Sequence, residues 1–295
     1  MTAIPDWRVA DAEEDGKRVE RINWSPVWWD GEGLHIYVND DVERPLFRLK
    51  FARGATFDVV PAERLIVSVK HADDISPLTM TQLLADQVEP RILAYEGVFI
   101  VHASAIEVDG AVVLFVGDSG AGKSTLAASF NQAGIPMLCD DAVIVEFADG
   151  QATGKALYPS LRLHPDSLEA LLPNLHPSAA LAYHGTKRRL DLPFQSRKIG
   201  ATLPIAAIFT LGAPLPTDCV AINAISPADL CMALVTNCFS LNPADLKQAG
   251  KKLRDAGLVA DRIPAFSLNY PHDYGLLPDV RAAILETVRQ TVVKE

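Results

Sequence analysis

The chain has 295 residues, of which 49% are hydrophobic and 22% are charged, and its formal net charge is −10. These proportions predict a folded protein with a sizeable core, arranged as one large domain or two smaller ones. An acidic chain lacks the basic surface of a duplex-binding protein, and anionic lipids should repel it. We therefore expect neither nucleic acid nor membrane as a partner. Any phosphate group that the protein binds must be held by a local binding site rather than by the overall charge.

Targeting and cysteine patterns point to a reducing compartment. The first residues contain no apolar signal core, and the longest apolar runs, such as Ala111–Val116, are far shorter than the ~20 residues of a membrane span. The four cysteines have no CxxC spacing and apolar neighbours, which predicts buried free thiols. The sequence therefore predicts a cytoplasmic protein.

The first third of the chain has the pattern of a small β-sheet. Residues 1–25 are polar and acidic, and we expect a loosely held lead-in. Trp24, Trp28 and Trp29 lie close together, and we interpret them as anchors of the core of the sheet rather than as a stacking surface for a ligand. Alternating or apolar β-branched runs predict strands at Leu34–Val38, Pro45–Phe51 and Leu65–Lys70.

A helix is expected at Thr79–Tyr95, with Pro90 ending or kinking it partway. Beyond it, strands and helices both occur. The predicted strands are Val98–Val101, Ser104–Val108, Ala111–Val116, Met137–Cys139, Val143–Phe147, Ile205–Leu211, Val220–Ile225 and Ala265–Tyr270, and the predicted helices are Ser124–Ala133, Ser167–Leu172, Ala228–Thr236, Pro243–Ala256 and Pro278–Val293. The pattern predicts a β-rich domain at residues 1–95 and an α/β nucleotide-binding domain at residues 96–295.

The segment Gly117–Ser124 matches the phosphate-binding pattern G-x-x-x-x-G-K-[ST], between an apolar strand and a helix. Glycines let successive N–H groups converge on phosphate oxygens, and the helix presents its positive N-terminus to them. We expect Lys123 to reach the β- and γ-phosphates and the Ser124 hydroxyl to bind Mg²⁺. The residues expected to contact the nucleotide are Gly117, Ser119, Gly120, Ala121, Gly122, Lys123, Ser124 and Thr125.

Two adjacent carboxylates, Asp140 and Asp141, follow the strand that comes after this loop. A carboxylate at such a strand end commonly holds Mg²⁺, and a second one could accept the proton of an attacking hydroxyl. The alternative is a solvated turn. Spacing alone favours a core position for His102, while Arg188 and Arg189 could clamp a transferred phosphate or belong to a solvated basic patch.

The ordered set His102–Ile106, Val112–Thr125 and Cys139–Val143 resembles the catalytic domain of the HPr kinase/phosphorylase family, which shares its core with ATP-dependent phosphoenolpyruvate carboxykinase. The resemblance covers roughly residues 95–150 and continues more weakly around Tyr158–Leu163 and Ile263–Leu268. It implies a P-loop nucleotide domain that uses ATP and Mg²⁺. Carried over by position, it implies Ser124 and Asp141 on the metal, Asp140 as the base for a substrate serine, and His102 supporting that base.

Two differences from the HPr kinase pattern affect which phosphate acceptor we expect. The chain has Thr125 where HPr kinases usually have glutamate, and Thr186–Asp191 where they carry an Arg-Gly-x-Gly segment tied to HPr docking. The general layout more closely resembles the HPr-kinase-like proteins found beside ribosomally made peptides, notably lasso peptides. We therefore expect a kinase acting on a serine of a peptide or protein, with homo-oligomerisation left open. The alternatives are a kinase for a small molecule such as free serine, and a nucleotide-dependent switch or ATPase without an acceptor.

Overall fold

The structure is a computed structural model that describes residues 4–12, 22–31, 33–39, 41, 43–52, 54–71, 75–148, 150–158, 161–177, 187–190, 200–216 and 219–292. Its class is mixed α/β, as expected, and it forms two compact units. The first consists mainly of residues 4–97 and 240–250, and the second of residues 98–177, 188–239 and 251–292. Among the described residues, no helix combines the length and the apolar character needed to cross a membrane.

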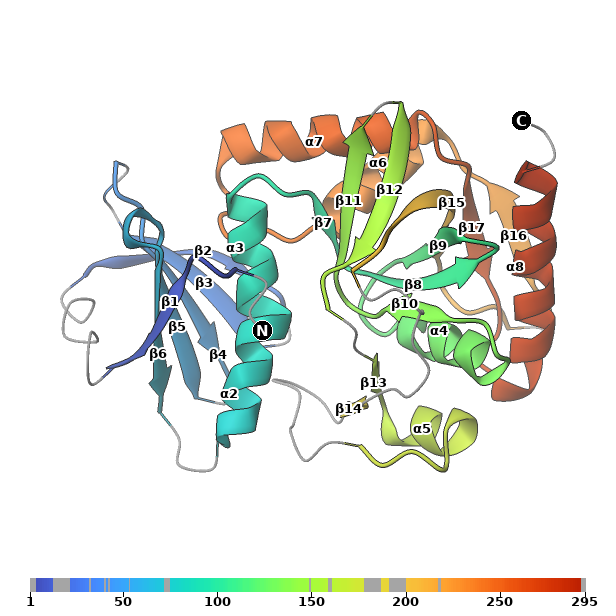
Figure 1. Ribbon diagram of the computed structural model, residues 1–295, viewed down its shortest axis with the longest axis horizontal. Coiled ribbons are helices and arrows are strands. Elements are labelled where there is room, and N and C mark those ends of the chain that lie inside the picture. Colours follow the sequence, from blue (N-terminus) through green and yellow to red (C-terminus); the bar gives the residue numbers. More distant parts are fainter. Residues whose placement is uncertain are drawn as a thin grey trace. The chain divides into compact units, whose positions relative to one another are not determined.

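The first unit is a six-stranded sheet with helices on one face (Figure 1). Its strand order is β1-β6-β5-β4-β3-β2, with β1 parallel to β6 and the other neighbours antiparallel. The strands are β1 (Arg8–Asp11), β2 (Trp24–Trp29), β3 (Leu34–Asn39), β4 (Phe47–Phe51), β5 (Ala55–Val60) and β6 (Leu65–Lys70). Alternate side chains of β3 and β4 are buried, as the period of two in their sequences predicts.

The core of the first unit lies between this sheet and the helices. Phe57 and Leu49 of the sheet share one apolar cluster with Val88 and Ile92 of the helices. Leu241 belongs to the same cluster and is fully buried. Burial of that side chain explains why residues 240–250 belong to this unit, although the sequence-based division assigned them to the second domain.

The expectation of a loose lead-in at residues 1–25 is wrong for the part that the structure describes. Ile4 and Trp7 are buried in the core of the sheet, and β1 pairs with β6 in register from Arg8 to Asp11. Apolar contacts of these two side chains hold the segment to the sheet despite its acidic composition. Residues 1–3 and 13–21 lie outside the described part of the chain.

The three neighbouring tryptophans do not anchor the core, contrary to the sequence-based interpretation. Trp28 and Trp29 are exposed, Trp29 by 60%, and Trp24 is half-buried beneath the guanidinium of Arg48, whose Cζ lies 4.5 Å from the ring centroid. A register shift between Pro26 and Trp28 interrupts the alternation of β2. Because β2 is an edge strand, its side chains gain few packing partners.

Replacing Trp29 with Ser should therefore lower the free energy of unfolding by less than about 1 kcal/mol, as at most surface positions. The buried Phe57→Ala variant is the matched comparison and should cost about 3–5 kcal/mol. Chemical denaturation followed by circular dichroism measures both changes. Equal losses in the two variants would show that Trp29 contributes to the core after all.

The helix expected at Thr79–Tyr95 is present but begins earlier and is not ended by Pro90. It starts as α2 (Pro77–Leu83), with the Ser76 hydroxyl accepting a 3.1 Å hydrogen bond from the Thr79 amide. A π-helical turn, Leu84–Val88, then leads into α3 (Glu89–Tyr95). The wider turn directly before Pro90 accommodates a residue that has no N–H to donate.

The second unit is built on a nine-stranded sheet. The main path is β10-β8-β9-β15-β12-β11-β7, and β17 pairs with β15 and β16. At its centre β9, β15 and β17 run parallel, with Val116 opposite Thr210 and Leu211 opposite Leu268. The strands are β7 (Ile100–Val101), β8 (Ala103–Val108), β9 (Ala111–Val116), β10 (Met137–Cys139), β11 (Val143–Ala148), β12 (Gln151–Ala156), β15 (Thr202–Leu211), β16 (Ala221–Ala224) and β17 (Ala265–Asn269), and a separate pair is formed by β13 (Leu161–Leu163) and β14 (Arg188–Leu190).

Helices cover both faces of this sheet (Figure 1). Along β9, Val113 and Phe115 pack in the cluster that contains α4 and α8, whereas Val112 and Leu114 pack in the cluster that contains α6 and α7. Burial on both sides explains why β9 is the most apolar strand of the chain. The helices are α4 (Lys123–Gln132), α5 (Pro165–Leu171), α6 (Pro227–Thr236), α7 (Leu246–Ala260) and α8 (Leu277–Val292).

Three expectations for the second half need correction. The apolar run at Val220–Ile225 suggested a buried strand, but the strand found there, β16, is shorter, lies at a sheet edge and is partly exposed. Helix α7 begins at Leu246 rather than Pro243, because the Asp245 carboxylate accepts hydrogen bonds from the first-turn amides of Lys247 and Gln248. The cysteines are free, as expected, but Cys219 is exposed and Cys139 alone is fully buried.

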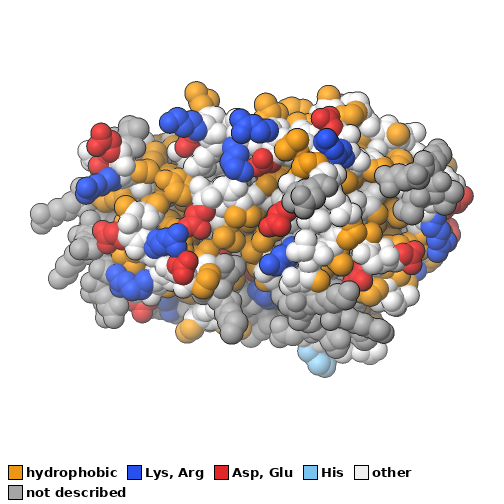
Figure 2. All heavy atoms as spheres, turned by 45° about the horizontal axis from the view of Figure 1, so that its top comes forward, with side chains coloured by type: hydrophobic (Ala, Val, Ile, Leu, Met, Phe, Trp, Pro, Cys, Tyr) orange, Lys and Arg blue, Asp and Glu red, His pale blue; other side chains and the backbone are white. Residues whose placement is uncertain are grey.

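Charged side chains are mixed by sign on the face shown in Figure 2. Lysines and arginines lie among aspartates and glutamates and do not gather into one basic stripe on that face. This face therefore lacks the single-sign patch that attracts polyanions.

Candidate functional site

The Gly117–Ser124 segment follows the carboxyl end of β9, and its last two residues are the first two residues of α4. Gly117 and Gly122 have φ angles of 154° and 93°, in the region that favours glycine. A Cβ on Gly117 would lie 2.9 Å from the carbonyl oxygen of Leu211, so this position also requires close backbone approach. The loop therefore curls as the motif predicts, against the end of the neighbouring parallel strand.

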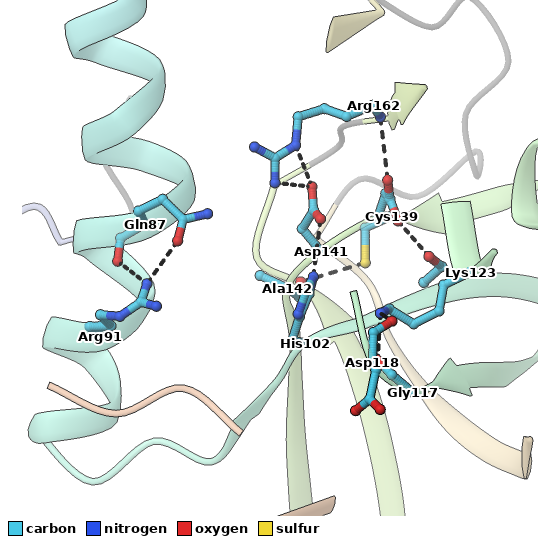
Figure 3. Close-up of polar contacts among 12 residues, drawn as sticks. Gln87, Arg91, His102, Gly117, Asp118, Lys123, Cys139, Asp141, Ala142 and Arg162 are labelled. Atoms are coloured by element: carbon cyan, nitrogen blue, oxygen red, sulfur yellow. Dashed lines mark hydrogen bonds and ion pairs between the residues drawn. The ribbon is translucent and has the colours of Figure 1, made fainter. Parts of the chain in front are cut away.

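Lys123 is buried and folds back over this loop (Figure 3). Its Nζ donates hydrogen bonds to the carbonyl oxygens of Gly117, at 2.6 Å, and Asp118, at 3.0 Å. Ser124 is buried beside it in the first turn of α4. The first-turn amides of a helix have no partner within the helix, so a cation and several N–H donors meet at this one point.

The hydroxyl of Thr125 is engaged within the protein. It lies 3.2 Å from the Ser167 hydroxyl, which in turn lies 3.0 Å from the Tyr274 hydroxyl. Tyr274 donates to Asp166 at 2.9 Å, completing a chain of polar contacts between α4 and α5. The side chain of Thr125 thus links two helices, and its main-chain N–H in the first turn of α4 is the group suited to an anion.

The aspartate pair sits in a strained turn directly after β10. Asp141 has a φ angle of 76°, and the Ala142 amide donates to the Asp140 carbonyl oxygen at 3.1 Å, which defines a γ-turn. Non-glycine residues rarely adopt this backbone conformation, and such strain occurs disproportionately at functional sites. The turn directs the two adjacent carboxylates toward different partners.

Asp140 is buried, and its carboxylate accepts hydrogen bonds from a hydroxyl and from a main-chain amide. Its Oδ1 accepts a hydrogen bond from the hydroxyl of Ser104, a fully buried residue of β8. Its Oδ2 accepts a longer one, 3.3 Å, from the main-chain amide of Arg162. The carboxylate is therefore held from two sides by elements far apart in sequence.

Asp141 is bound by charged and ring nitrogens (Figure 3). Its Oδ2 accepts from Nε and Nη2 of Arg162 at 2.8 and 2.7 Å. Its Oδ1 lies 3.3 Å from Nε2 of His102. The residue expected to support Asp140 thus contacts Asp141 instead.

The imidazole ring of His102 is close enough to Lys123, Asp140 and Asp141 for their charges to affect its pKa. Its side chain keeps 38% of its surface exposed, yet the surrounding protein atoms lower its pKa below the ordinary value. The hydrogen bond to Asp141 opposes this pKa shift, the charge of Lys123 adds to it, and the charges of both aspartates oppose it. The lowered pKa favours the neutral ring, in which a proton on Nε2 would be donated to the ionised Asp141 carboxylate.

Cys139, directly before the aspartates, is poorly suited to act as a nucleophile. Burial, together with the charges of Asp140 and Asp141, holds the pKa of its thiol well above the ordinary value. A thiol that stays protonated is a weak nucleophile. It packs as a small apolar side chain at the end of β10.

The two candidate phosphate-binding arginines lie on opposite faces of β14. Arg189 pairs with Arg162 across the β13–β14 ladder, so it shares a face with the arginine that binds Asp141, and its guanidinium lies 5.9 Å from the ring of Tyr158. Arg188 pairs with the buried Leu163, and its Nη1 is buried without a hydrogen bond to any described residue. Only Arg189 therefore shares the face of the aspartate site.

Sequence reasoning assigned no role to Ser104 and Arg162. Ser104 follows His102 by two residues in an extended segment, which puts both side chains on one face and could have suggested a shared role. Arg162 lies in the segment of weaker family resemblance, but no local pattern links it to residues about 20 positions earlier. Its partners became visible only in the folded chain.

The residues expected on Mg²⁺ have suitable chemistry. A serine hydroxyl and carboxylates are hard oxygen donors, and Mg²⁺ is usually bound by one or two carboxylates together with substrate phosphates. Arg162 and His102 orient the Asp141 carboxylate as surrounding groups orient metal-binding carboxylates elsewhere. The arrangement can hold a phosphate chain at the loop and an ionised carboxylate beside it.

One comparison with known proteins agrees with the motif-based resemblance. No protein-family model matches the chain. Over 58 residues the chain is 43% identical to the HPr kinase/phosphorylase of Mycoplasmopsis pulmonis (strain UAB CTIP), which confirms the expected resemblance to HPr kinases in that segment. The match spans 20% of this chain and 19% of the relative's length. The structure of the Hpr(Ser) kinase/phosphatase from Coxiella burnetii is 12% identical, with a TM-score of 0.34, covering 65% of this chain and 97% of that one.

Proposed function

We propose that the protein is a kinase that uses ATP and Mg²⁺ to phosphorylate a serine hydroxyl in a peptide or protein. The observation that carries the proposal is that His102, whose Nε2 lies 3.3 Å from Asp141, is also close enough to Lys123 of the glycine loop for that charge to act on its ring (Figure 3). We therefore infer that Lys123 of the phosphate-binding loop and the two aspartates act in one site. Phosphoryl transfer requires these two components, because it depends on positioning and on neutralising charge.

Each residue has a distinct task in this proposal. The first-turn amides of α4 and Lys123 would hold the β- and γ-phosphates, and Ser124 and Asp141 would hold Mg²⁺, which would supply positive charge to these phosphates. Asp140 accepts the proton of the acceptor hydroxyl. The partner of Asp141 supports this assignment, since the Arg162 guanidinium favours the ionised form of that carboxylate, which is the form that binds a metal ion.

The resemblance to HPr kinases also supports a proposal for the domain organisation and for the acceptor of the phosphate. We propose that the second unit forms a P-loop catalytic domain of the HPr kinase type, and that the first unit, which includes residues 240–250, is a separate β-rich domain. The relative's name identifies it as an HPr kinase/phosphorylase. The layout favours a ribosomally made precursor, of the kind that gives lasso peptides, as the acceptor here.

Incubation with γ-labelled ATP and Mg²⁺ tests the proposed function. The acceptors are serine-containing precursor peptides, the same peptides with that serine replaced by alanine, and free serine. We expect label in the serine peptide and none in its alanine counterpart. Label on free serine would identify a small-molecule kinase, and release of phosphate without transfer would identify an ATPase or switch.

HPr itself should be a poor acceptor. The glycine-rich segment tied to HPr docking is replaced here by Lys187–Asp191, so the contacts that position HPr should be missing. We expect its labelling rate to be at least about tenfold below that of an accepted peptide, which corresponds to roughly 1.4 kcal/mol of lost transition-state stabilisation. Efficient labelling of HPr on serine would show that the replacement does not matter.

A further inference from the structure

Tyr270 brings a side chain to the glycine loop from the far end of the sequence. It directly follows β17, which runs parallel to β15, as β9 does. The carboxyl ends of parallel strands lie at one edge of a sheet, where α/β proteins bind their ligands. Tyr270 therefore reaches the same edge as the loop that follows β9.

The Tyr270 hydroxyl lies against the last glycine of the loop. A Cβ built on Gly122 would be 3.2 Å from this oxygen and 3.8 Å from Nε2 of His272, whose ring centroid is 5.8 Å from that of Tyr270. Only 4% of the surface of Tyr270 is exposed, and this burial raises its pKa to about 12. The hydroxyl is therefore protonated near neutral pH and available as a donor.

This hydroxyl has no hydrogen-bond partner among the described residues, although its ring is buried. The ring is enclosed but the hydroxyl oxygen keeps access to solvent, so it opens beside the loop rather than into the core. Tyr274, four residues later, differs in this respect, since its hydroxyl contacts both Ser167 and Asp166. The unpartnered donor of Tyr270 points instead to a ligand bound at the loop.

We propose that Tyr270 donates a hydrogen bond to a phosphate oxygen of the bound nucleotide and so forms a second wall of the phosphate site, opposite the loop amides. The inference rests on the proposed function. A neutral hydroxyl adds a charge-assisted hydrogen bond to the phosphate chain without adding a second cation beside Lys123. Its position against Gly122 assigns it to the phosphates rather than to the base or ribose.

Isothermal titration calorimetry of the full chain with Mg–ATP and with inorganic tripolyphosphate tests this inference. Tyr270→Phe removes only the hydroxyl, and we expect it to weaken both ligands by about 10- to 100-fold, the range for a hydrogen bond to a charged group. Tyr274→Phe is the matched control. Because its hydroxyl is bonded within the protein, its removal should change either affinity by less than about threefold.

The outcomes separate this inference from the proposed function. Unchanged affinity of Tyr270→Phe for both ligands would overturn the role of the hydroxyl and leave the kinase proposal standing. A loss for ATP alone, with tripolyphosphate unaffected, would also overturn it by assigning the hydroxyl to the nucleoside. Failure of the wild-type chain to bind either ligand would overturn both proposals, and thermal unfolding of each variant excludes a folding defect.

Discussion

Lys123→Ala should reduce phosphoryl transfer by at least about 10²–10³-fold and weaken ATP binding. The side chain is the loop's point charge, and its Nζ also closes the loop by donating to the carbonyl oxygens of Gly117 and Asp118. Its loss therefore removes both the attraction for the β- and γ-phosphates and two contacts that shape the loop. Initial rates with labelled ATP, together with calorimetric affinity for Mg–ATP, measure the two effects.

Lys251→Ala is the matched control for this variant. Lys251 is also a lysine in an early turn of a helix, but it is exposed and paired with Asp255 at 2.6 Å, so its loss should leave transfer unchanged. Unaltered turnover in Lys123→Ala would contradict the kinase proposal as a whole. Thermal unfolding of both variants shows whether any loss of activity reflects the loop or the stability of the fold.

Asp140→Asn and Asp141→Asn should fail in different ways. Asp140→Asn keeps the shape and the neighbours of the side chain but removes a proton acceptor, so turnover should fall by ~10²–10⁴-fold while Mg–ATP binds nearly as before. Asp141→Asn removes charge from the metal site and weakens the ion pair with Arg162. Its rate should therefore recover in part when the Mg²⁺ concentration is raised.

Turnover, ATP affinity and Mg²⁺ dependence of the two variants decide the roles. Rescue of Asp140→Asn by metal, without rescue of Asp141→Asn, would reverse the assignment. Full activity in both variants would reduce the pair to a solvated turn. An asparagine at 141 also leaves a guanidinium facing a neutral amide in a buried site, so the stability of that variant should be compared with Asp255→Asn, which alters only an exposed ion pair.

Local sequence determined the glycine loop and its surroundings. The apolar strand Ala111–Val116, the turn at Asp109 and Gly110, and the helix beginning at Lys123 all depend on residues within about 25 positions of one another. Their signals are short-range, because glycine conformations, strand burial and helix starts are encoded by neighbouring residues. The position of the aspartate pair at a strand end was predictable for the same reason.

Register and edge position decided which side chains became buried. The pairing of β14 with β13 put Arg189 and Arg188 on opposite faces, which the dipeptide alone cannot distinguish. Trp29 is exposed because β2 lies at an edge and carries a register shift, whereas Trp7, in a segment of acidic composition, is buried. A one-residue change of register moves every side chain to the other face, so hydrophobic content could not decide these cases.

The sequence by itself therefore determined where phosphates can bind and which carboxylates lie near them, and the tertiary structure decided how those groups are held. A γ-turn at Asp141 directs its carboxylate to His102 and Arg162, and leaves Asp140 to Ser104. Tyr270 reaches the loop across about 150 residues of chain, through the parallel pairing of three strands. Such contacts depend on the pairing of distant strands, and no local pattern of residues encodes that pairing.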